Sequence, residues 1–362
     1  MDYIFIYPLS AVLGLIIGSF LNVVIYRTEK DKKFTGRSFC PKCKKQILWY
    51  DNVPLLSFLL LRGRCRFCRR KISAQYPIVE MLTGLAFLAA AYLILSNILN
   101  DWLGHYYGIV GVATMLAKYN LTASLAAWDF YLKFFELLFL WIFFSILIVI
   151  LVYDFKNMLI PDSFTIAGII AAAVYGIAMD VLLFLGVAAS NNQNFILAVS
   201  SLEKKQNPPG ILPFDISSFF TFGQENFYST IVHWKSFFPA SGNLVGDTTL
   251  SYAEHPWQFI YSFLTETRTG SGLIAALVIA AIFFLIVYLS QETWMGMGDV
   301  KLVFFLGLLL GIFKAAVALF LAFEIGAVVG IVLILSGRAK MKTALPFGPF
   351  LILGAVLSLI FI

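Results

Sequence analysis

Long apolar runs alternate with short polar stretches along this chain. The first apolar run, from Ile4 to Ile25, contains no charged residue and stops just before Arg27. About 20 mostly apolar residues are needed for a helix to cross the hydrocarbon core of a bilayer. Runs of this length recur, so we expect an all-α polytopic membrane protein with about eight transmembrane helices, a small cytosolic zinc-binding segment and an outer polar insertion.

The polar stretches divide the chain into five parts. These are a first transmembrane helix (1–25), a cytosolic segment with four cysteines (26–76), helices two to four (77–188), an extracytoplasmic insertion (189–270) and helices five to eight (271–362). Two finer features are predicted. We expect an outer loop from about residue 96 to residue 131, and a hinge at Phe313 and Lys314 between the sixth and seventh helices.

Composition and charge agree with a membrane location. Hydrophobic residues make up 60% of the chain and charged residues 13%, whereas soluble domains carry about 25% charged residues. The net charge of +6 comes from basic residues concentrated between Arg27 and Lys71, next to the membrane. The positive-inside rule therefore places this segment and the later loops with Asp154 and Asp299 in the cytosol, with both termini outside. Membrane topology explains the basic residues, and no nucleic-acid partner is expected.

The N-terminal run is expected to be kept as a spanning helix. It is longer than the apolar region of a signal peptide and no basic region precedes it.

All four cysteines of the chain lie in the cytosolic segment as two Cys-x-x-Cys pairs. The pairs are Cys40 with Cys43 and Cys65 with Cys68. Their separation is typical of two knuckles that supply four thiolates to one tetrahedral zinc ion. Four thiolates leave no open coordination position, so we expect structural rather than catalytic zinc. Reduced, unligated cysteines are the plainer alternative.

Two acidic residues stand where apolar helices meet the cytosol. Asp154 directly follows the run Ile150-Leu151-Val152-Tyr153, and Asp299 follows Gly296-Met297-Gly298 and opens a new apolar helix. Ionisable groups at such places are costly unless they have a function. Two nearby carboxyls share one proton, and such a pair can hydrolyse a peptide bond by activating water and polarising the carbonyl group.

A structural interpretation competes with catalysis at each aspartate. Asp154 can set topology in a tight loop, and Asp299 can cap a helix by accepting backbone hydrogen bonds. Gly296 and Gly298 are expected to support the motif by allowing close backbone approach. Lys301 follows two residues after Asp299, and its role stays open between phospholipid and a substrate carboxylate.

Several motifs together resemble the bacterial type IV prepilin peptidase family, whose members are GxGD-type intramembrane aspartyl proteases. In chain order they are the run from Gly18 to Arg27, the paired Cys-x-x-Cys segment, Ile72-Ser73 with Tyr76-Pro77, Glu80, Asp154 with Ile160-Pro161-Asp162, Gly296-Met297-Gly298-Asp299-Val300-Lys301, and Pro346-Phe347-Gly348-Pro349. The resemblance implies that Asp154 and Asp299 are the catalytic aspartates.

The same resemblance implies the rest of the activity. A type IV prepilin or pseudopilin would be cut after the glycine of its basic leader, and the new amino terminus would be methylated with S-adenosylmethionine. Asn22 and Glu80 are candidate methyltransferase residues. The implied location is the bacterial cytoplasmic membrane, with the active site at the cytosolic face. Implied partners are membrane lipid and components of pilus or type II secretion assembly.

Two other classes of protein are open alternatives. An ion-coupled transporter would use Asp154, Asp299 and Glu324 as ion sites, and a non-catalytic assembly scaffold would keep the zinc segment as a cap. A transporter of this kind is expected to contain internal repeats, and no repeat relates the two halves of the sequence.

Overall fold

The computed structural model describes residues 5–33, 36–108, 122–189, 267–293, 295–337 and 346–361; for 95–108, 122–131 and 183–189 the description covers the backbone alone. Contacts divide the chain into two compact units. Unit 1 comprises Met1–Asp101, Lys133–Ala171 and Val328–Ile352, and unit 2 comprises Trp102–Leu132, Ala172–Ala327 and Leu353–Ile362. The expected insertion, 189–270, lies outside the described residues except at its two ends.

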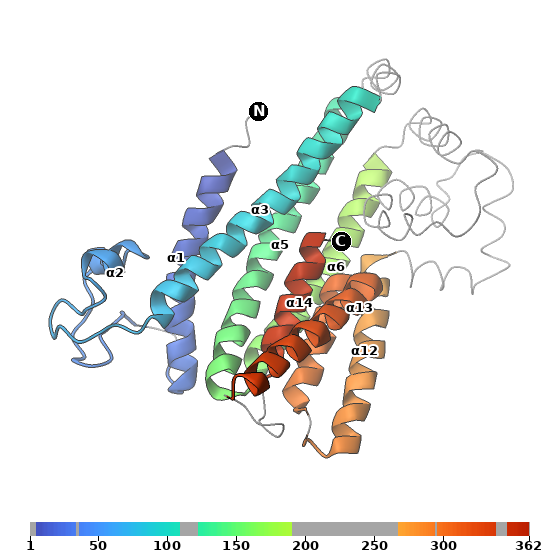
Figure 1. Ribbon diagram of the computed structural model, residues 1–362. Coiled ribbons are helices and arrows are strands. Elements are labelled where there is room, and N and C mark those ends of the chain that lie inside the picture. Colours follow the sequence, from blue (N-terminus) through green and yellow to red (C-terminus); the bar gives the residue numbers. More distant parts are fainter. Residues whose placement is uncertain are drawn as a thin grey trace, which may run out of the picture. The chain divides into compact units, whose positions relative to one another are not determined.

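Helices form the regular structure of the described residues (Figure 1). Their bounds are α1 Ile6–Glu29, η2 Trp49–Asn52, α2 Leu56–Leu60, α3 Gln75–Gly108, α5 Thr122–Asn157, α6 Asp162–Ala189, α12 Arg268–Ser290, α13 Met297–Leu335 and α14 Gly348–Phe361. Within these residues, β-pairing is limited to isolated bridges. The all-α prediction is confirmed.

Six of these helices are long and apolar enough to cross a membrane. They are α1, the part of α3 from Gln75 to Ile94, the part of α5 from Leu132 to Asn157, the part of α6 from Asp162 to Leu182, α12 and α13. Helix α13 is broken at Gly311, and α14 is a shorter apolar helix. The expected sixth and seventh helices correspond to the two arms of α13 and the expected eighth to α14, so the described residues contain six candidate spans where about eight were expected.

Two boundaries differ from the sequence prediction. The hinge lies at Gly311 and not at Phe313 and Lys314, because its φ of 73° and ψ of 178° are accessible to glycine and strained for other residues. The expected outer loop from residue 96 to 131 is also wrong at both ends. Helix α3 runs on to Gly108 and α5 begins at Thr122, since no proline interrupts either extension and helix propagation costs little once a helix has formed.

The core of unit 1 is built from α1, α3 and α5. Helices α1 and α3 approach closely at Gly14, where a Cβ atom would lie 2.7 Å from the Thr83 carbonyl oxygen. On α5, Trp141 stacks on Phe87 of α3 with ring centroids 5.3 Å apart. Further apolar side chains from the three helices form one buried cluster: Leu21, Ile25, Val79, Ile148 and Val149. This core holds the three helices together near the zinc-binding segment.

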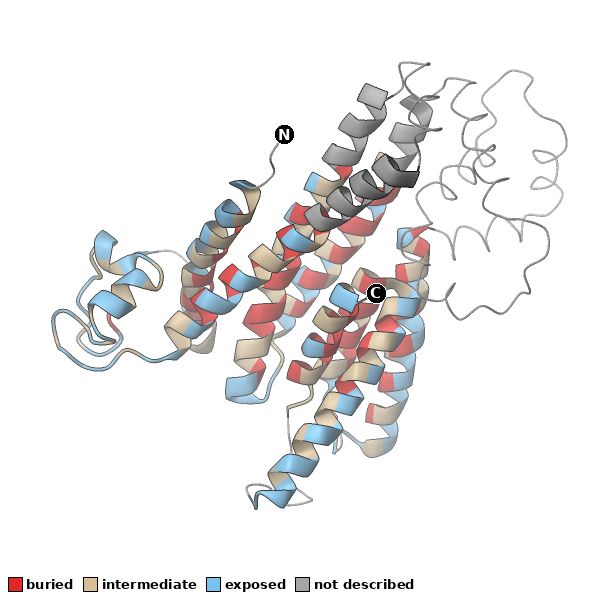
Figure 2. Cartoon of the chain, turned by 45° about the horizontal axis from the view of Figure 1, so that its top comes forward, coloured by how far each residue is buried: buried red, intermediate tan, exposed pale blue. Residues whose placement is uncertain are grey.

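Unit 2 contains α12, most of α13 and the end of α14. Helix α12 packs closely on the first arm of α13. The close approach is seen at Gly272, where a Cβ atom would lie 2.6 Å from the Leu308 carbonyl oxygen. The carboxylate of Asp180 on α6 accepts the backbone N–H groups of Arg268 and Thr269 at 3.1 and 3.0 Å. This carboxylate therefore caps the start of α12. Large apolar side chains are exposed along the helices of both units (Figure 2), as expected of surfaces that face lipid.

Candidate active site and metal centre

Asp154 lies in the last turn of α5, where this helix reaches the end of its apolar span. The residue is only 4% exposed, and its Oδ2 atom is buried without a hydrogen-bond partner. A buried polar atom without a partner is uncommon in folded proteins and calls for an explanation. A site that receives water or substrate is one such explanation.

The beginning of α14 lies directly against this carboxyl group. A Cβ atom at Gly348 would stand 2.5 Å from Asp154 Oδ2 and 3.3 Å from its Cγ atom. Gly348 is therefore required as glycine for Asp154 to keep its position. The sequence singled out the Pro-Phe-Gly-Pro motif around Gly348 without assigning it this contact, because nothing in the local pattern points to Asp154.

Asp299 lies in a different setting, in unit 2. Helix α13 begins at Met297, so Asp299 is inside the first turn and does not occupy the capping position considered from the sequence. Its backbone N–H donates to the Gly296 carbonyl at 3.1 Å, and the residue is half-buried. Lys301 lies in the same turn of the helix and is also half-buried.

Gly296 does not need to be glycine for reasons of space. A Cβ atom there would meet only the Gly298 nitrogen, at 4.0 Å. The close approach that the sequence suggested is thus not found at Gly296. Asp154 belongs to unit 1 and Asp299 to unit 2.

The four cysteines come together as the spacing predicts. Their Sγ atoms all lie within 4.8 Å of one another, and Cys40 Sγ is 4.0 Å from Cys68 Sγ. A tetrahedral zinc ion with Zn–S bonds of about 2.3 Å separates its sulfur ligands by roughly 3.8 Å. The cluster therefore fits a zinc ion held by Cys40, Cys43, Cys65 and Cys68, which would crosslink a segment with little core of its own.

Both Cys-x-x-Cys pairs are built in the same way. In the first, the N–H of Cys40 donates to the Lys45 carbonyl at 2.9 Å, and in the second the N–H of Cys65 donates to the Arg70 carbonyl at 3.0 Å. Each turn is completed by a residue with positive φ, Lys44 at 59° or Arg69 at 53°. The repeated turn explains why two separate sequence motifs present four converging thiols.

The pKa values of the Cys40 and Cys68 thiols are shifted in opposite directions. Desolvation by burial opposes the thiolate of Cys40, but backbone hydrogen bonds at Cys43 and Lys42 and the neighbouring thiols outweigh it and lower its pKa to about 7. At Cys68 a backbone hydrogen bond at Arg70 favours the thiolate, whereas desolvation and the neighbouring thiols raise its pKa to about 11. A low thiol pKa favours metal binding because the thiolate is the ligand.

The two candidate methyltransferase residues join α1, α3 and the zinc segment. Asn22 on α1 is 1% exposed and donates its Nδ2 to the carbonyls of Tyr76 at 3.0 Å and Gly18 at 3.3 Å, while its Oδ1 atom is buried without a partner. Glu80 on α3 is 8% exposed and accepts the backbone N–H of Leu55 at 2.9 Å. Both contacts hold neighbouring segments together.

Two family models match parts of the chain. The model described as the bacterial peptidase A24 N-terminal domain matches residues 12–94, and the model of the type IV leader peptidase family matches residues 257–331. The first range contains the four cysteines, Asn22 and Glu80, and the second contains Asp299. Asp154 and Gly348 lie outside both ranges.

Several curated relatives carry the same printed name. The prepilin leader peptidase/N-methyltransferase of Myxococcus xanthus is 57% identical over 79 residues, which cover 22% of this chain and 24% of the relative. The protein of the same name from Vibrio cholerae is 36% identical over 186 residues, covering 48% of this chain and 58% of the relative. The one from Pectobacterium carotovorum is 35% identical over 178 residues, covering 43% of this chain and 50% of the relative. The chain thus spans between a quarter and about three fifths of the length of these relatives. No solved structure matches the chain.

Proposed function

Because the chain belongs to the bacterial type IV leader peptidase family, we propose that it cleaves the leader peptides of type IV prepilins or pseudopilins. Asp154 and Asp299 are the proposed catalytic residues. The observation that carries this proposal is the buried, unpartnered oxygen of Asp154 at the end of a membrane-spanning helix. For Asp299 the support is its place within the Gly-Met-Gly-Asp motif that the second family model matches.

In the proposed reaction the two carboxyls share one proton. The ionised carboxylate takes a proton from a water molecule, whose oxygen attacks the scissile carbonyl carbon, while the protonated carboxyl donates its proton to the carbonyl oxygen. The resulting diol collapses as the C–N bond breaks and the leaving nitrogen takes a proton. No acyl-enzyme intermediate is formed. Gly296, Gly298 and Lys301 support this motif in the proposal.

The proposed orientation brings substrate and aspartates to the same membrane face. Basic residues concentrated between Arg27 and Lys71 put the zinc segment and both aspartate-bearing helix ends in the cytosol and both termini outside. The basic leader of the substrate would then stay in the cytosol while its apolar segment enters the bilayer of the cytoplasmic membrane. Pilus or type II secretion components are further proposed partners.

Processing of a synthetic prepilin by the detergent-solubilised full-length protein tests the proposal. Asp154→Asn and Asp299→Asn should each lower the cleavage rate by about 10²–10⁴-fold, the contribution typical of general acid–base catalysis. Matched controls are Glu136→Gln on α5 and Glu292→Gln just before α13, and both should cleave normally. A folded Asn variant that cleaves at the wild-type rate would refute the assignment. Ion transport without cleavage would favour the transporter.

We also propose that the protein methylates the new amino terminus, since the names of its relatives include N-methyltransferase. S-adenosylmethionine would supply the methyl group to the amine, which then loses a proton. Asn22 and Glu80 are the proposed residues of this step. Both lie in the range matched by the N-terminal family model.

Product mass separates methylation from cleavage. Asn22→Ala and Glu80→Gln should yield cleaved product that lacks the added methyl group, measured with a labelled methyl donor. If both activities and thermal stability fall together, the two residues only hold α1, α3 and the zinc segment in place, as their contacts allow.

A further inference from the structure

The zinc segment exposes a set of large apolar side chains that nothing in the described chain covers. We call these residues the apolar patch: Trp49, Tyr50, Val53, Leu56, Leu59 and Leu60. Trp49 is 81% exposed and Leu60 is 80% exposed. They come from η2, α2 and the turn between them, and η2 packs against α2. Exposed apolar residues that cluster in this way mark a binding surface.

Helix α2 presents one face to the patch and the opposite face to its own segment. Leu56, Leu59 and Leu60 follow the i, i+3, i+4 spacing that places side chains on one side of a helix. Phe58 points elsewhere, because its ring lies 3.1 Å from the position of a Cβ atom at Gly63. Phe58 therefore serves the packing of the segment, and the patch leucines are left for another partner.

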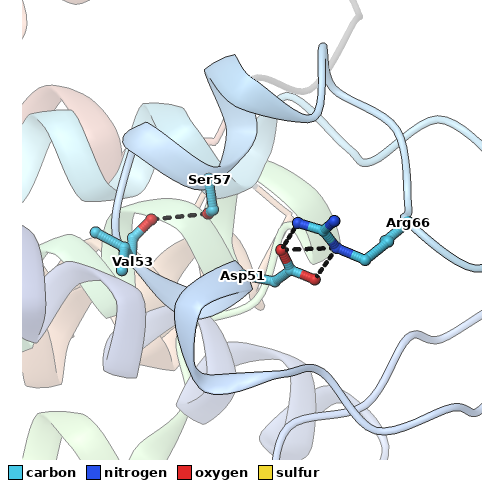
Figure 3. A network of polar contacts seen from close by, with 4 residues as sticks. All are labelled: Asp51, Val53, Ser57 and Arg66. Atoms are coloured by element: carbon cyan, nitrogen blue, oxygen red, sulfur yellow. Dashed lines mark hydrogen bonds and ion pairs between the residues drawn. The ribbon is translucent and has the colours of Figure 1, made fainter.

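Polar contacts fix the backbone that carries the patch. Arg66 forms a two-pronged ion pair with Asp51 of η2, with Nη2 2.6 Å from Oδ1 and Nε 2.8 Å from Oδ2 (Figure 3). The Arg66 guanidinium group also lies over the Tyr50 ring. The Ser57 hydroxyl donates to the Val53 carbonyl at 2.7 Å (Figure 3). These contacts hold the backbone of the apolar patch in place.

The charge around the patch is strongly positive. Residues 26–76 contain 14 Lys and Arg residues and three Asp and Glu residues. Two of these acids are already paired: Asp51 with Arg66, and Glu29 with Lys156 of α5 at 2.6 Å. A surface of this kind attracts anionic partners and repels the basic leader of a prepilin.

The patch is tied to the first turns of a spanning helix. The backbone N–H of Leu55, the residue before α2, donates to Glu80 Oε2 at 2.9 Å, and Glu80 lies in the second turn of the span Gln75–Ile94. The start of α2 is therefore held at the depth where α3 enters the bilayer. Apolar residues with flanking tryptophan, tyrosine and basic side chains suit the boundary between headgroups and acyl chains.

We propose that the apolar patch inserts into the cytosolic leaflet of the bilayer, while the surrounding Lys and Arg residues bind anionic lipid headgroups. The zinc segment then lies on the membrane surface instead of extending into the cytosol. Anionic lipid in this leaflet attracts basic segments next to a membrane helix. The proposal rests on the contacts of the zinc segment and not on the peptidase activity.

Quenching of Trp49 fluorescence by brominated lipid tests this proposal in the full-length protein. The protein is placed in nanodiscs at one copy each, and subtracting the emission of Trp49→Phe isolates the Trp49 signal. We expect strong loss of this signal with lipids brominated near the headgroup end of the acyl chain, and greater loss with anionic than with zwitterionic lipid. Trp141→Phe gives the matched signal of a residue inside a spanning helix, which should be quenched most by deeper bromine atoms.

Three results would overturn the proposal. One is a Trp49 signal that shallow bromine atoms leave unchanged in every lipid. Another is protection of Trp49 from an aqueous quencher only after a prepilin is added, which would assign the patch to the substrate. The third is protection only in nanodiscs with two copies of the protein, which would assign it to a dimer. None of these readouts depends on cleavage.

Discussion

Asp154 and Asp299 occupy corresponding places in the sequence pattern but are held in very different ways. Asp154 is buried at the end of a 36-residue helix, and the backbone of Gly348 lies against its carboxyl group. Asp299 is half-buried in the first turn of α13, three residues after Gly296, which has open space around it. Asp154 is thus in direct contact with a backbone segment far away in the chain, whereas Asp299 lies at the start of its helix, where the nearby Gly296 has room for a side chain.

The contrast indicates where substitutions near each aspartate should be tolerated. A methyl group added at Gly348 would meet the Asp154 carboxyl itself, so small side-chain changes at the start of α14 should lower the proposed cleavage activity. Around Gly296 an added methyl group meets no atom closer than 4.0 Å. The proposed pair thus combines one carboxyl that an added Cβ atom at a distant glycine would displace with one whose neighbouring Gly296 can accept a side chain.

Among substitutions at glycines near the two aspartates, the largest effect on cleavage is expected for Gly348→Ala. Its Cβ atom would force the Asp154 carboxyl to rotate away, and misplacing a reacting group by about 1 Å costs roughly 10²-fold in rate. We expect kcat for prepilin cleavage to fall by about that factor, measured by product mass over time.

Gly354→Ala provides the control on the same helix. Its Cβ atom would clash with the Ala318 carbonyl of α13 and not with Asp154. This variant should lower the thermal stability more than Gly348→Ala does, but lower cleavage per folded molecule less. Equal losses of activity in the two variants would show that Asp154 is not specifically affected.

Loss of a zinc ligand is expected to act on stability. Cys65→Ser should lower the zinc content from about one ion per chain, measured by elemental analysis. The zinc segment should then unfold at lower temperature, because structural zinc contributes about 10–16 kcal/mol to the folding of small zinc-binding peptides. Ser57→Ala changes an exposed hydroxyl of the same segment and should retain zinc. A Cys65→Ser variant that lacks zinc but unfolds at the same temperature as the zinc-loaded wild type would contradict a structural zinc site.

The smallest effect is expected for Gly296→Ala. The open space around this residue and its ordinary φ predict a change in cleavage rate of no more than a few fold, since alanine costs little where no atom is displaced. Initial rates at saturating substrate measure the change. A loss as large as that of Gly348→Ala would show that Gly296 has to adopt a second conformation during the reaction.

The sequence predicted those features that depend on local pattern. Apolar runs of sufficient length located the spanning helices, and the spacing of Cys40, Cys43, Cys65 and Cys68 predicted one cluster because metal ligands must converge. Hydropathy alone does not determine where a helix ends, so the extension of α3 to Gly108 was missed. The same holds for the break at Gly311, which depends on a backbone conformation that leaves the apolar pattern unchanged.

The sequence pattern did not predict contacts between segments that are far apart in the chain. Gly348 and Asp154 are far apart in the chain, and neither sequence motif indicates that the two residues are in contact. The capping of α12 by Asp180 was missed for the same reason. For Glu80, the sequence suggested a methyltransferase role, while its contact with Leu55 depends on how the zinc segment folds back on α3.

The most direct test of the central claim compares cleavage by Asp154→Asn, Asp299→Asn and the variant with both substitutions. Two groups that act as one catalytic unit give strongly non-additive losses. We predict that the double variant is no slower than either single variant, with all three folded and loaded with zinc. Losses that multiply in the double variant, or a single variant that keeps the wild-type rate, would contradict a shared role of the two carboxyls.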